Sequence, residues 1–222
     1  MNEVRGSAKN ISILNLLRII LMNRRHGLRK EGKYMAMKKK IAVLFPGIGY
    51  HTDKPLLYYS KKLARQRGYE IIEVKYGTLP SNVKGNSKRM LEAFQKALKY
   101  ATEQLVGIQF DAYDEVLFLS KSVGTAVAAN YAKNNRLKVR QVYYTPVVES
   151  FDAIGQEGIV FHGTSDPWAD TEQIKKECKK RNLLLYLTEN ANHSMETGNV
   201  EQDLVIMKDI MRKTAEYMDR EG

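Results

Sequence analysis

The sequence predicts an α/β protein with a mostly parallel central sheet of about six strands and helices on both faces. Short apolar segments of strand length alternate with segments of helix length along most of the chain, as in sheets joined by right-handed crossovers. The strand segments are almost continuously apolar, as expected when both faces of a sheet are covered. Hydrophobic residues make up 43% of the chain and charged residues 27%, which is typical of a soluble globular domain.

The first half of the chain contains three of these strands and three helices. Residues 41–45 form an uninterrupted apolar run that ends at Pro46. Pro55 suits the first turn of a helix, and Gly68 suits its end. A polar loop over residues 78–86 precedes a long amphipathic segment. The expected strands cover residues 41–45, 70–76 and 116–119, and the expected helices cover residues 56–67, 87–106 and 125–132.

The second half repeats the alternation. Pro146 and Gly163 each end a strand, because neither residue favours the continuation of a buried strand. The expected strands cover residues 139–144, 158–162 and 183–187, and the expected helices cover residues 171–180 and 199–218. The last helix is amphipathic, and its apolar face is expected to consist of Leu204, Val205, Met207, Met211 and Ala215.

The net charge of +11 is concentrated near the N-terminus. Residues 1–40 carry eleven Lys and Arg against two acidic residues, a net charge of +9, so the remainder carries only +2. The basic balance therefore does not indicate a nucleic-acid partner for the folded body. The expected organisation is an N-terminal extension over residues 1–37 and a single domain over residues 38–222.

The extension is expected to be disordered or to reflect a mis-annotated start. Its apolar segment, residues 11–22, is too short to span a bilayer, and its positive cluster follows that segment rather than preceding it as in a secretory signal. A short interfacial anchor is the alternative. Codons for residues 30–32 can contain a bacterial ribosome-binding sequence, so translation is expected to begin at Met35 or Met37.

The single cysteine, Cys178, leaves no internal disulfide and has no metal-ligating neighbours in the sequence. We therefore expect a cytoplasmic protein from a reducing compartment, with no metal and no membrane attachment.

The stretch around Ser122 has the layout of a nucleophile elbow. An apolar strand leads into a run of small residues, and an alanine-rich helix follows. Because the turn is strained, the residues two before and two after the nucleophile must be small, and Ser120 and Gly124 meet this requirement. The usual pattern G-x-S-x-G has glycine at the first position, so Ser120 departs from it. The alternative is a plain connection between a strand and a helix.

Three side chains follow the carboxyl ends of three expected strands, where chemistry gathers in such sheets. Ser122 follows the third strand, Asp166 the fifth and His193 the sixth. An imidazole activates a serine hydroxyl, and a buried carboxylate orients the imidazole and stabilises its charged form. We therefore expect a catalytic Ser-His-Asp triad. Glu149 and Asp152, after the fourth strand, are alternatives for the acid.

An oxyanion formed by serine attack needs preorganised N–H donors. One donor is expected to be the backbone N–H of Val123, which follows the nucleophile. The other is expected to be the N–H of Gly47 or Ile48, in the loop after the first strand. Dinucleotide binding by this loop is excluded, since a third glycine is missing at Thr52 and no acidic residue ends the second strand.

For other residues near these loops, the sequence predicts roles that are less specific. His162 is expected to pack structurally at a strand end. Tyr50 and His51 are candidates for lining the pocket, and Trp168 is either a pocket wall or an ordinary half-buried aromatic residue. Lys121, the variable residue of the elbow, is expected to point toward the mouth of the site.

Over roughly residues 38–218 the sequence resembles the α/β-hydrolase family, and most closely its small members without a cap, the dienelactone-hydrolase-like group. The resemblance rests on the elbow and on the order Ser122, Asp166, His193. It implies that Val123 and Gly47 or Ile48 form the oxyanion hole, and that no cofactor is needed. The first two strands of the family are absent, and only residues 145–157 occupy the place where larger members insert a lid.

Two functions are compatible with these features. The first is a serine hydrolase that cleaves an ester, thioester or related acyl bond of a small-molecule substrate through an acyl-enzyme. The alternative is a catalytically silent relative that binds a small ligand or a protein partner, because one fold hosts both.

Overall fold

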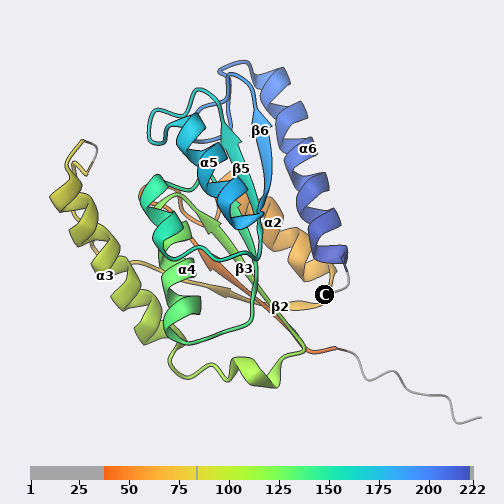
Figure 1. Cartoon of the computed structure of the whole chain (residues 1–222). Helices are drawn as coiled ribbons and strands as arrows, with labels where there is room; N and C mark the ends of the chain where they lie inside the picture. The colour runs from red at the N-terminus through yellow and green to blue at the C-terminus, as the bar shows by residue number, and fades with distance from the viewer. Residues whose placement is uncertain (1–37, 84, 221–222) are drawn as a thin grey trace, which may run out of the picture. The chain divides into compact units, whose positions relative to one another are not determined.

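The computed structural model describes residues 38–83 and 85–220, which contain one six-stranded sheet (Figure 1). The strand order is β2-β1-β3-β4-β5-β6, and every neighbouring pair is parallel. This confirms the predicted α/β class. The expectations for residues 1–37 lie outside the described residues. The strands are β1 Lys40–Phe45, β2 Tyr69–Glu73, β3 Glu115–Lys121, β4 Arg140–Tyr144, β5 Ile159–Gly163 and β6 Leu184–Thr188.

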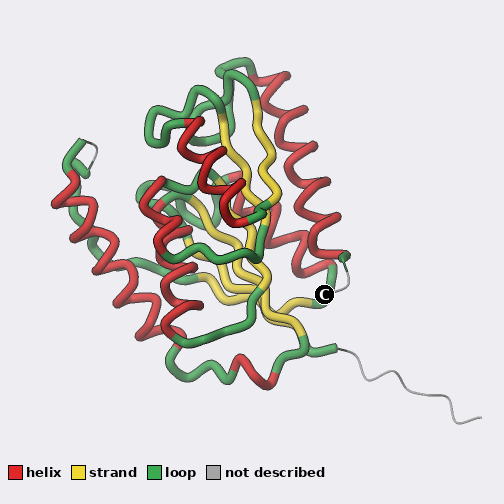
Figure 2. The backbone as a smooth tube through the Cα atoms, viewed as in Figure 1, coloured by secondary structure: helices red, strands yellow, loops and turns green. Residues whose placement is uncertain are grey.

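Helices cover both faces of the sheet, as predicted (Figures 1 and 2). On one face α2 and α6 pack against the strands, and on the other face α3, α4 and α5 do so. The helices are α2 Pro55–Gln66, α3 Ser87–Leu105, α4 Val123–Asn134, α5 Thr171–Arg181 and α6 Val200–Asp219. Two short 3₁₀ turns, η1 Phe110–Ala112 and η2 Val148–Asp152, were not expected from the sequence pattern.

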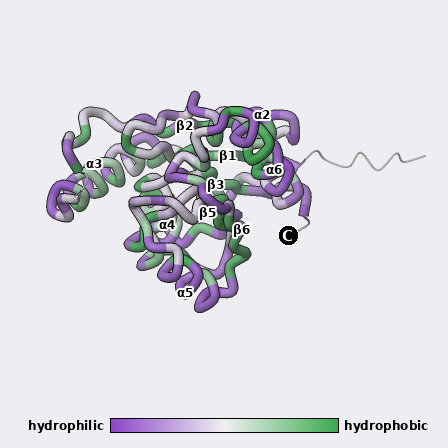
Figure 3. The backbone as a smooth tube through the Cα atoms, turned by 90° about the horizontal axis from the view of Figure 1, so that it is seen from above, coloured by the Kyte–Doolittle hydropathy of each residue, from purple (hydrophilic) through white to green (hydrophobic). Residues whose placement is uncertain are grey.

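The strands form the centre of the apolar core (Figure 3). Alternate side chains of one strand point to opposite faces, so β3 contributes Leu117 and Leu119 to the face under α2 and α6, and Phe118 to the face under α3 and α4. All three side chains are fully buried. The central strand is therefore held from both sides, which fixes the position of the residues that follow it.

The predicted apolar face of α6 is partly wrong. Leu204 and Val205 are 67% and 69% exposed. The residues that contact the sheet are offset from them around the helix and include Ile206, Met207, Ile210, Met211, Thr214, Tyr217 and Met218. The spacing of apolar residues is compatible with several rotations of α6 about its own axis. Packing against β4 to β6 selects one of these rotations.

The segment between β4 and β5, residues 145–158, forms only η2 and turns. The carboxyl edge of the sheet therefore carries no inserted domain at this point. No helix within residues 38–83 and 85–220 combines the length and the apolar character that crossing a membrane requires.

Candidate active site

Ser122 lies in the turn between β3 and α4, with φ 54° and ψ −127°. Such a backbone conformation is costly for a residue other than glycine and persists only where the surroundings impose it. The surroundings are tight. A Cβ atom on Gly124 would lie 2.3 Å from the carbonyl oxygen of Phe45 and 2.4 Å from that of Pro46, so α4 can approach β1 only because this residue is glycine.

Ser120 occupies the position where the usual elbow has glycine. It is fully buried, and its hydroxyl donates to the carbonyl oxygen of Val142 at 3.1 Å. The extra side chain is accommodated because it bonds to the neighbouring strand β4. The departure from the common pattern thus leaves the turn intact.

The three predicted side chains are brought together at the carboxyl edge of the sheet. His193 Nε2 lies 2.8 Å from Ser122 Oγ, and His193 Nδ1 lies 2.7 Å from Asp166 Oδ2. The Asp166 side chain has no exposed surface, and it also accepts the backbone N–H of Trp168 at 2.8 Å. Because an ionised carboxylate can only accept, Nδ1 carries the proton and Nε2 accepts from the serine hydroxyl.

The loop that carries His193 is held at several points. The Thr145 hydroxyl donates to the His193 carbonyl oxygen at 3.0 Å, and Thr145 itself adopts a positive φ of 42°. The Ser165 N–H donates to the carbonyl oxygen of Ala191 at 3.0 Å, which joins the Asp166 loop to the His193 loop. Sequence reasoning missed Thr145, and only its position after a strand and before Pro146 hinted at a special turn.

Burial and neighbouring charges determine the protonation states of Asp166 and His193. Burial acts to raise the pKa of Asp166, but the hydrogen bond and charge of His193 and the Trp168 N–H outweigh it, so the pKa is lowered. The pKa of His193 is lowered as well, first by burial and also by the charge of Lys121, against the opposing effect of Asp166. The site therefore contains a carboxylate and a neutral imidazole near pH 7.

The hydrogen bonds of the backbone near Ser122 distinguish Gly47 from Ile48 as the candidate for the second N–H donor. The Gly47 N–H donates to the Tyr50 carbonyl oxygen at 3.0 Å, so it is already used. The Ile48 N–H has no acceptor within the described part of the chain. The Val123 N–H belongs to the first turn of α4, where amides lack an intrahelical acceptor. A Cβ atom on Gly47 would lie 3.1 Å from that of Ser122, so this loop passes directly beside the serine.

Solved structures resemble this one over most of its length. An esterase from Pyrococcus furiosus superposes with a TM-score of 0.59 at 14% identity, covering 82% of this chain and 83% of the other. A protein from Xanthomonas campestris pv. campestris, assigned to the α/β superfamily of hydrolases, gives a TM-score of 0.59 at 14% identity, over 81% of this chain and 98% of its own. The chain has the α/β-hydrolase fold.

A serine hydrolase without a lid from Xanthomonas campestris also has this fold, with a TM-score of 0.51, 10% identity, and coverage of 81% of this chain and 84% of the other. No protein-family model matches the sequence. No curated protein matches it either. At these identities the likeness extends to the α/β-hydrolase fold, and the roles of individual residues rest on the geometry of the site.

Within this α/β-hydrolase fold the remaining candidates differ in position. The Trp168 ring lies 5.6 Å from the His193 ring, centroid to centroid, so it forms a wall of the site. His162 is fully buried, with Nε2 3.0 Å from Thr171 Oγ1, which fits the structural role expected for it. His51 is exposed, with 66% of its side-chain surface accessible. Glu149 and Asp152 are exposed residues of η2, and the carboxylate that bonds to His193 is Asp166.

The expectation for Lys121 is wrong. Its side chain is fully buried rather than directed to the mouth of the site. β3 continues through this residue, so the lysine follows the alternation of the strand and points into the sheet face that also buries Leu119.

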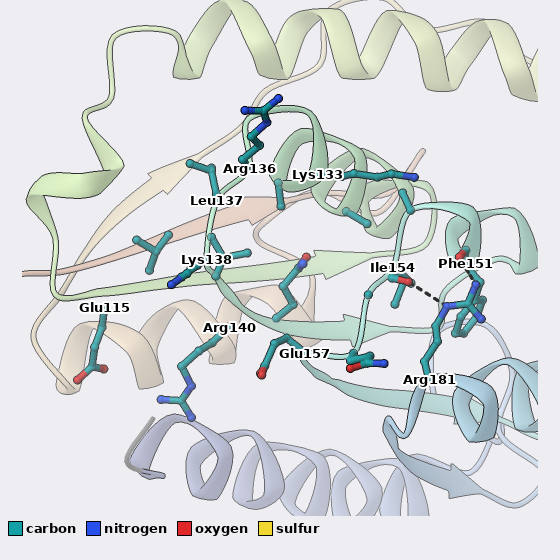
Figure 4. A pocket seen from close by; sticks show the side chains of 18 of the residues that line it. Glu115, Lys133, Arg136, Leu137, Lys138, Arg140, Phe151, Ile154, Glu157 and Arg181 are labelled. Carbon is teal, nitrogen blue, oxygen red and sulfur yellow. Dashed lines mark hydrogen bonds between the residues drawn. The ribbon is translucent and has the colours of Figure 1, made fainter.

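Two of the cavities in the described part of the chain lie at opposite ends of the sheet. A cavity of about 990 Å³ is lined by the amino ends of β3 and β4 and by the end of α4 (Figure 4). Its lining residues lie at the opposite end of these strands from Ser122. A second cavity, of about 520 Å³, is lined by residues 46–49 beside the free Ile48 N–H, and by Tyr76. In α/β sheets ligands bind at the carboxyl edge, so the smaller cavity, which shares the loop of residues 46–49 with the surroundings of Ser122, is the candidate for a ligand.

Proposed function

We propose that this protein is a serine hydrolase that cleaves an ester, thioester or related acyl bond of a small molecule. The observation that supports it is the continuous hydrogen-bonded chain from Ser122 through His193 to Asp166, with distances of 2.8 and 2.7 Å. These three residue types in this order can generate a nucleophile from an otherwise unreactive hydroxyl.

In the proposed mechanism the Ser122 oxygen attacks the acyl carbon while His193 Nε2 takes the hydroxyl proton. Asp166 keeps the proton of the imidazole on Nδ1 and stabilises the imidazolium that forms. The N–H groups of Val123 and Ile48 donate to the oxyanion of the tetrahedral intermediate. His193 then donates its proton to the leaving group, and a water molecule activated by the same imidazole hydrolyses the acyl-enzyme.

The cavity of about 520 Å³ beside Ile48 is the proposed place for one part of the substrate. Its volume lies within the range of small-molecule sites, roughly 300 to 1,000 Å³. No lid closes over the carboxyl edge between β4 and β5, which supports a site open to soluble substrates rather than one activated at a lipid interface.

A fluorophosphonate probe tests the proposal, because it labels only a serine activated by its surroundings. We expect the wild type to be labelled, and Ser122→Ala and His193→Ala to lose labelling completely. Ser120→Ala is the matched control, since it removes a buried serine hydroxyl two residues away that does not contact His193, and it should remain reactive.

Two outcomes would contradict the proposal. Labelling that persists in Ser122→Ala would show that another residue reacts. Absence of labelling in a wild-type protein that is folded by circular dichroism would favour the alternative, a silent member of the fold that binds a ligand or a partner.

A further inference from the structure

Lys121, the residue immediately before Ser122, is buried without a partner. Its side chain is 0% exposed, and its Nζ makes no hydrogen bond within the described part of the chain. It ends β3 on the same face as Leu117 and Leu119, which are fully buried. A buried amine without a partner lowers the stability of the folded state, so its presence beside the nucleophile indicates a functional role.

A second buried lysine among the described residues shows how the fold can satisfy such a group. Lys61 of α2 has 8% of its side-chain surface exposed, and its Nζ lies 3.2 Å from Asp53 and 3.0 Å from Glu73. Two carboxylates thus neutralise Lys61. No carboxylate within the described residues forms an ion pair with Lys121.

The surroundings of Lys121 leave its charge unneutralised. The Tyr50 ring faces it, with 4.9 Å between Nζ and the ring centroid. The Tyr50 hydroxyl accepts the Leu56 N–H, and burial raises the pKa of Tyr50 to about 12, so the ring offers its face but no negative charge.

Lys121 adjoins Ser122, whose Oγ lies 2.8 Å from His193 Nε2, so the amine and the two titratable groups of the triad belong to one region. Burial lowers the pKa of Lys121 to about 7, and the charge of Asp166 opposes this effect. The charge of Lys121 in turn lowers the pKa of His193. The charge of Glu196, in the same loop as His193, raises the pKa of Tyr50. The charge of His162 lowers the pKa of Asp166, and the charge of His193 lowers the pKa of His162. Each of these loops ends or begins at the carboxyl edge of the sheet.

We propose that Lys121 is a positioning residue that acts through His193: its ammonium group opposes protonation of the imidazole and so keeps the base neutral as the pH falls. This inference rests on the proposed function of the site. When the pH drops below neutral, Lys121 gains its proton first, and its positive charge then shifts the protonation of His193 to a lower pH. Hydrolysis thereby continues further into the acidic range than the Ser122-His193-Asp166 arrangement alone would allow.

The test is a titration of the His193 imidazole by ¹H–¹⁵N NMR in the full chain, with the signal assigned by its loss in His193→Asn. Lys121→Met keeps an unbranched side chain one heavy atom shorter and removes the charge. Its His193 midpoint should rise by about one pH unit, a shift typical of the loss of one nearby charge in a partly buried setting. With an aryl ester as substrate, the acid limb of kcat/KM should rise by the same amount.

The matched control is Lys62→Met. Lys62 is an exposed lysine of α2 whose Nζ lies 4.7 Å from the centroid of the Tyr58 ring, so it makes the same kind of contact away from the site. Its removal changes the net charge equally and should leave the His193 midpoint unchanged. An equal midpoint in the wild type and in Lys121→Met would overturn the proposal, as would an equal rise in Lys62→Met.

The wild type provides a second measurement that needs no variant of Lys121. The ¹³C signal of the Lys121 ε-carbon should titrate near pH 7. A Lys121 midpoint below that of His193 would overturn the proposal, because the amine would then be neutral while the imidazole takes its proton. If the wild type hydrolyses no ester but the His193 midpoint rises in Lys121→Met, the proposed function fails and the electrostatic coupling stands.

Discussion

Lys121 and Ser122 are adjacent residues, and each lowers the stability of the folded state. Ser122 adopts a positive φ of 54°, and Lys121 places an amine in the core with no partner among the described residues. Strained or unsatisfied groups persist where the rest of the structure compensates for them, and they concentrate at functional sites. Their coincidence beside His193 and Asp166 supports the assignment of this edge of the sheet as the site.

The first prediction at the residue scale concerns stability and pH. The pKa of Lys121 is lowered from 10.5 to about 7 in the folded state, so the unfolded chain binds more protons between these values. Burial of Lys121 therefore does not lower the free energy of unfolding above pH 10.5, where the amine is neutral in both states. As the pH falls from 10.5 toward 7, the free energy of unfolding decreases. Lys121→Met should be more stable than the wild type at pH 7, by up to about 5 kcal/mol.

Urea unfolding at pH 7 and at pH 9.5 checks this expectation. The gain from Lys121→Met should shrink at the higher pH, because the wild-type amine is then neutral in the folded state and closer to neutral in the unfolded state. If Lys121→Met is more stable than the wild type by the same amount at both pH values, the increase in stability comes from packing alone.

At the scale of elements, the contact between β1 and α4 sets the elbow. α4 begins directly after Ser122, and its second residue, Gly124, passes the carbonyl oxygens of Phe45 and Pro46. β1 leads into the loop that carries the Ile48 N–H. The same close approach therefore aligns the nucleophile with both candidate oxyanion donors.

Gly124→Ala tests this contact. The added Cβ would lie 2.3 Å from a backbone oxygen, so β1 and α4 must separate, and we expect a loss of about 1–3 kcal/mol together with reduced fluorophosphonate labelling. Gly155→Ala is the control, since a Cβ there meets no atom within 4 Å, and its effect should stay within about 0.5 kcal/mol. Urea unfolding of both variants measures the difference, and equal stability would argue against a tight elbow.

At the scale of the whole described domain, α6 closes one face of the sheet and is tied down at its end. Arg140 of β4 donates to the carbonyl oxygen of Met218 at 3.2 Å and to that of Tyr217, and its guanidinium lies 4.6 Å from the Tyr217 ring centroid. The last carbonyl groups of a helix lack intrahelical donors, so this arginine satisfies two of them. Arg67, the residue that caps the end of α2, adds an ion pair with Asp219 at 2.7 Å.

Arg140→Met should therefore fray the last turn of α6 and cost about 1–3 kcal/mol, because the hydrogen bonds come from a charged donor. Hydrogen exchange should accelerate in residues 214–219. Arg65→Met removes an exposed arginine of α2 and should change neither quantity. If exchange in α6 is the same in both variants, the arginine does not hold this helix.

Most of the strands and helices could be predicted because their signals are local. Continuous apolar runs marked β1 and β3, and the small residues around Ser122 marked the elbow within five positions. The order of Ser122, Asp166 and His193 at three strand ends was also visible, since parallel strands bring their carboxyl ends to one edge. Thr145 gave no comparable signal, because its bond to the His193 carbonyl joins residues 48 positions apart.

The sequence by itself determined the fold class, the elbow and the three side chains that meet in the site. The tertiary structure alone decided that the Gly47 N–H is used by Tyr50, that α6 turns Leu204 outward, and that Lys121 is buried beside His193. The physical reason is the range of the interactions. Backbone preference and periodicity act over a few residues, whereas burial and charge depend on neighbours that come from distant parts of the chain.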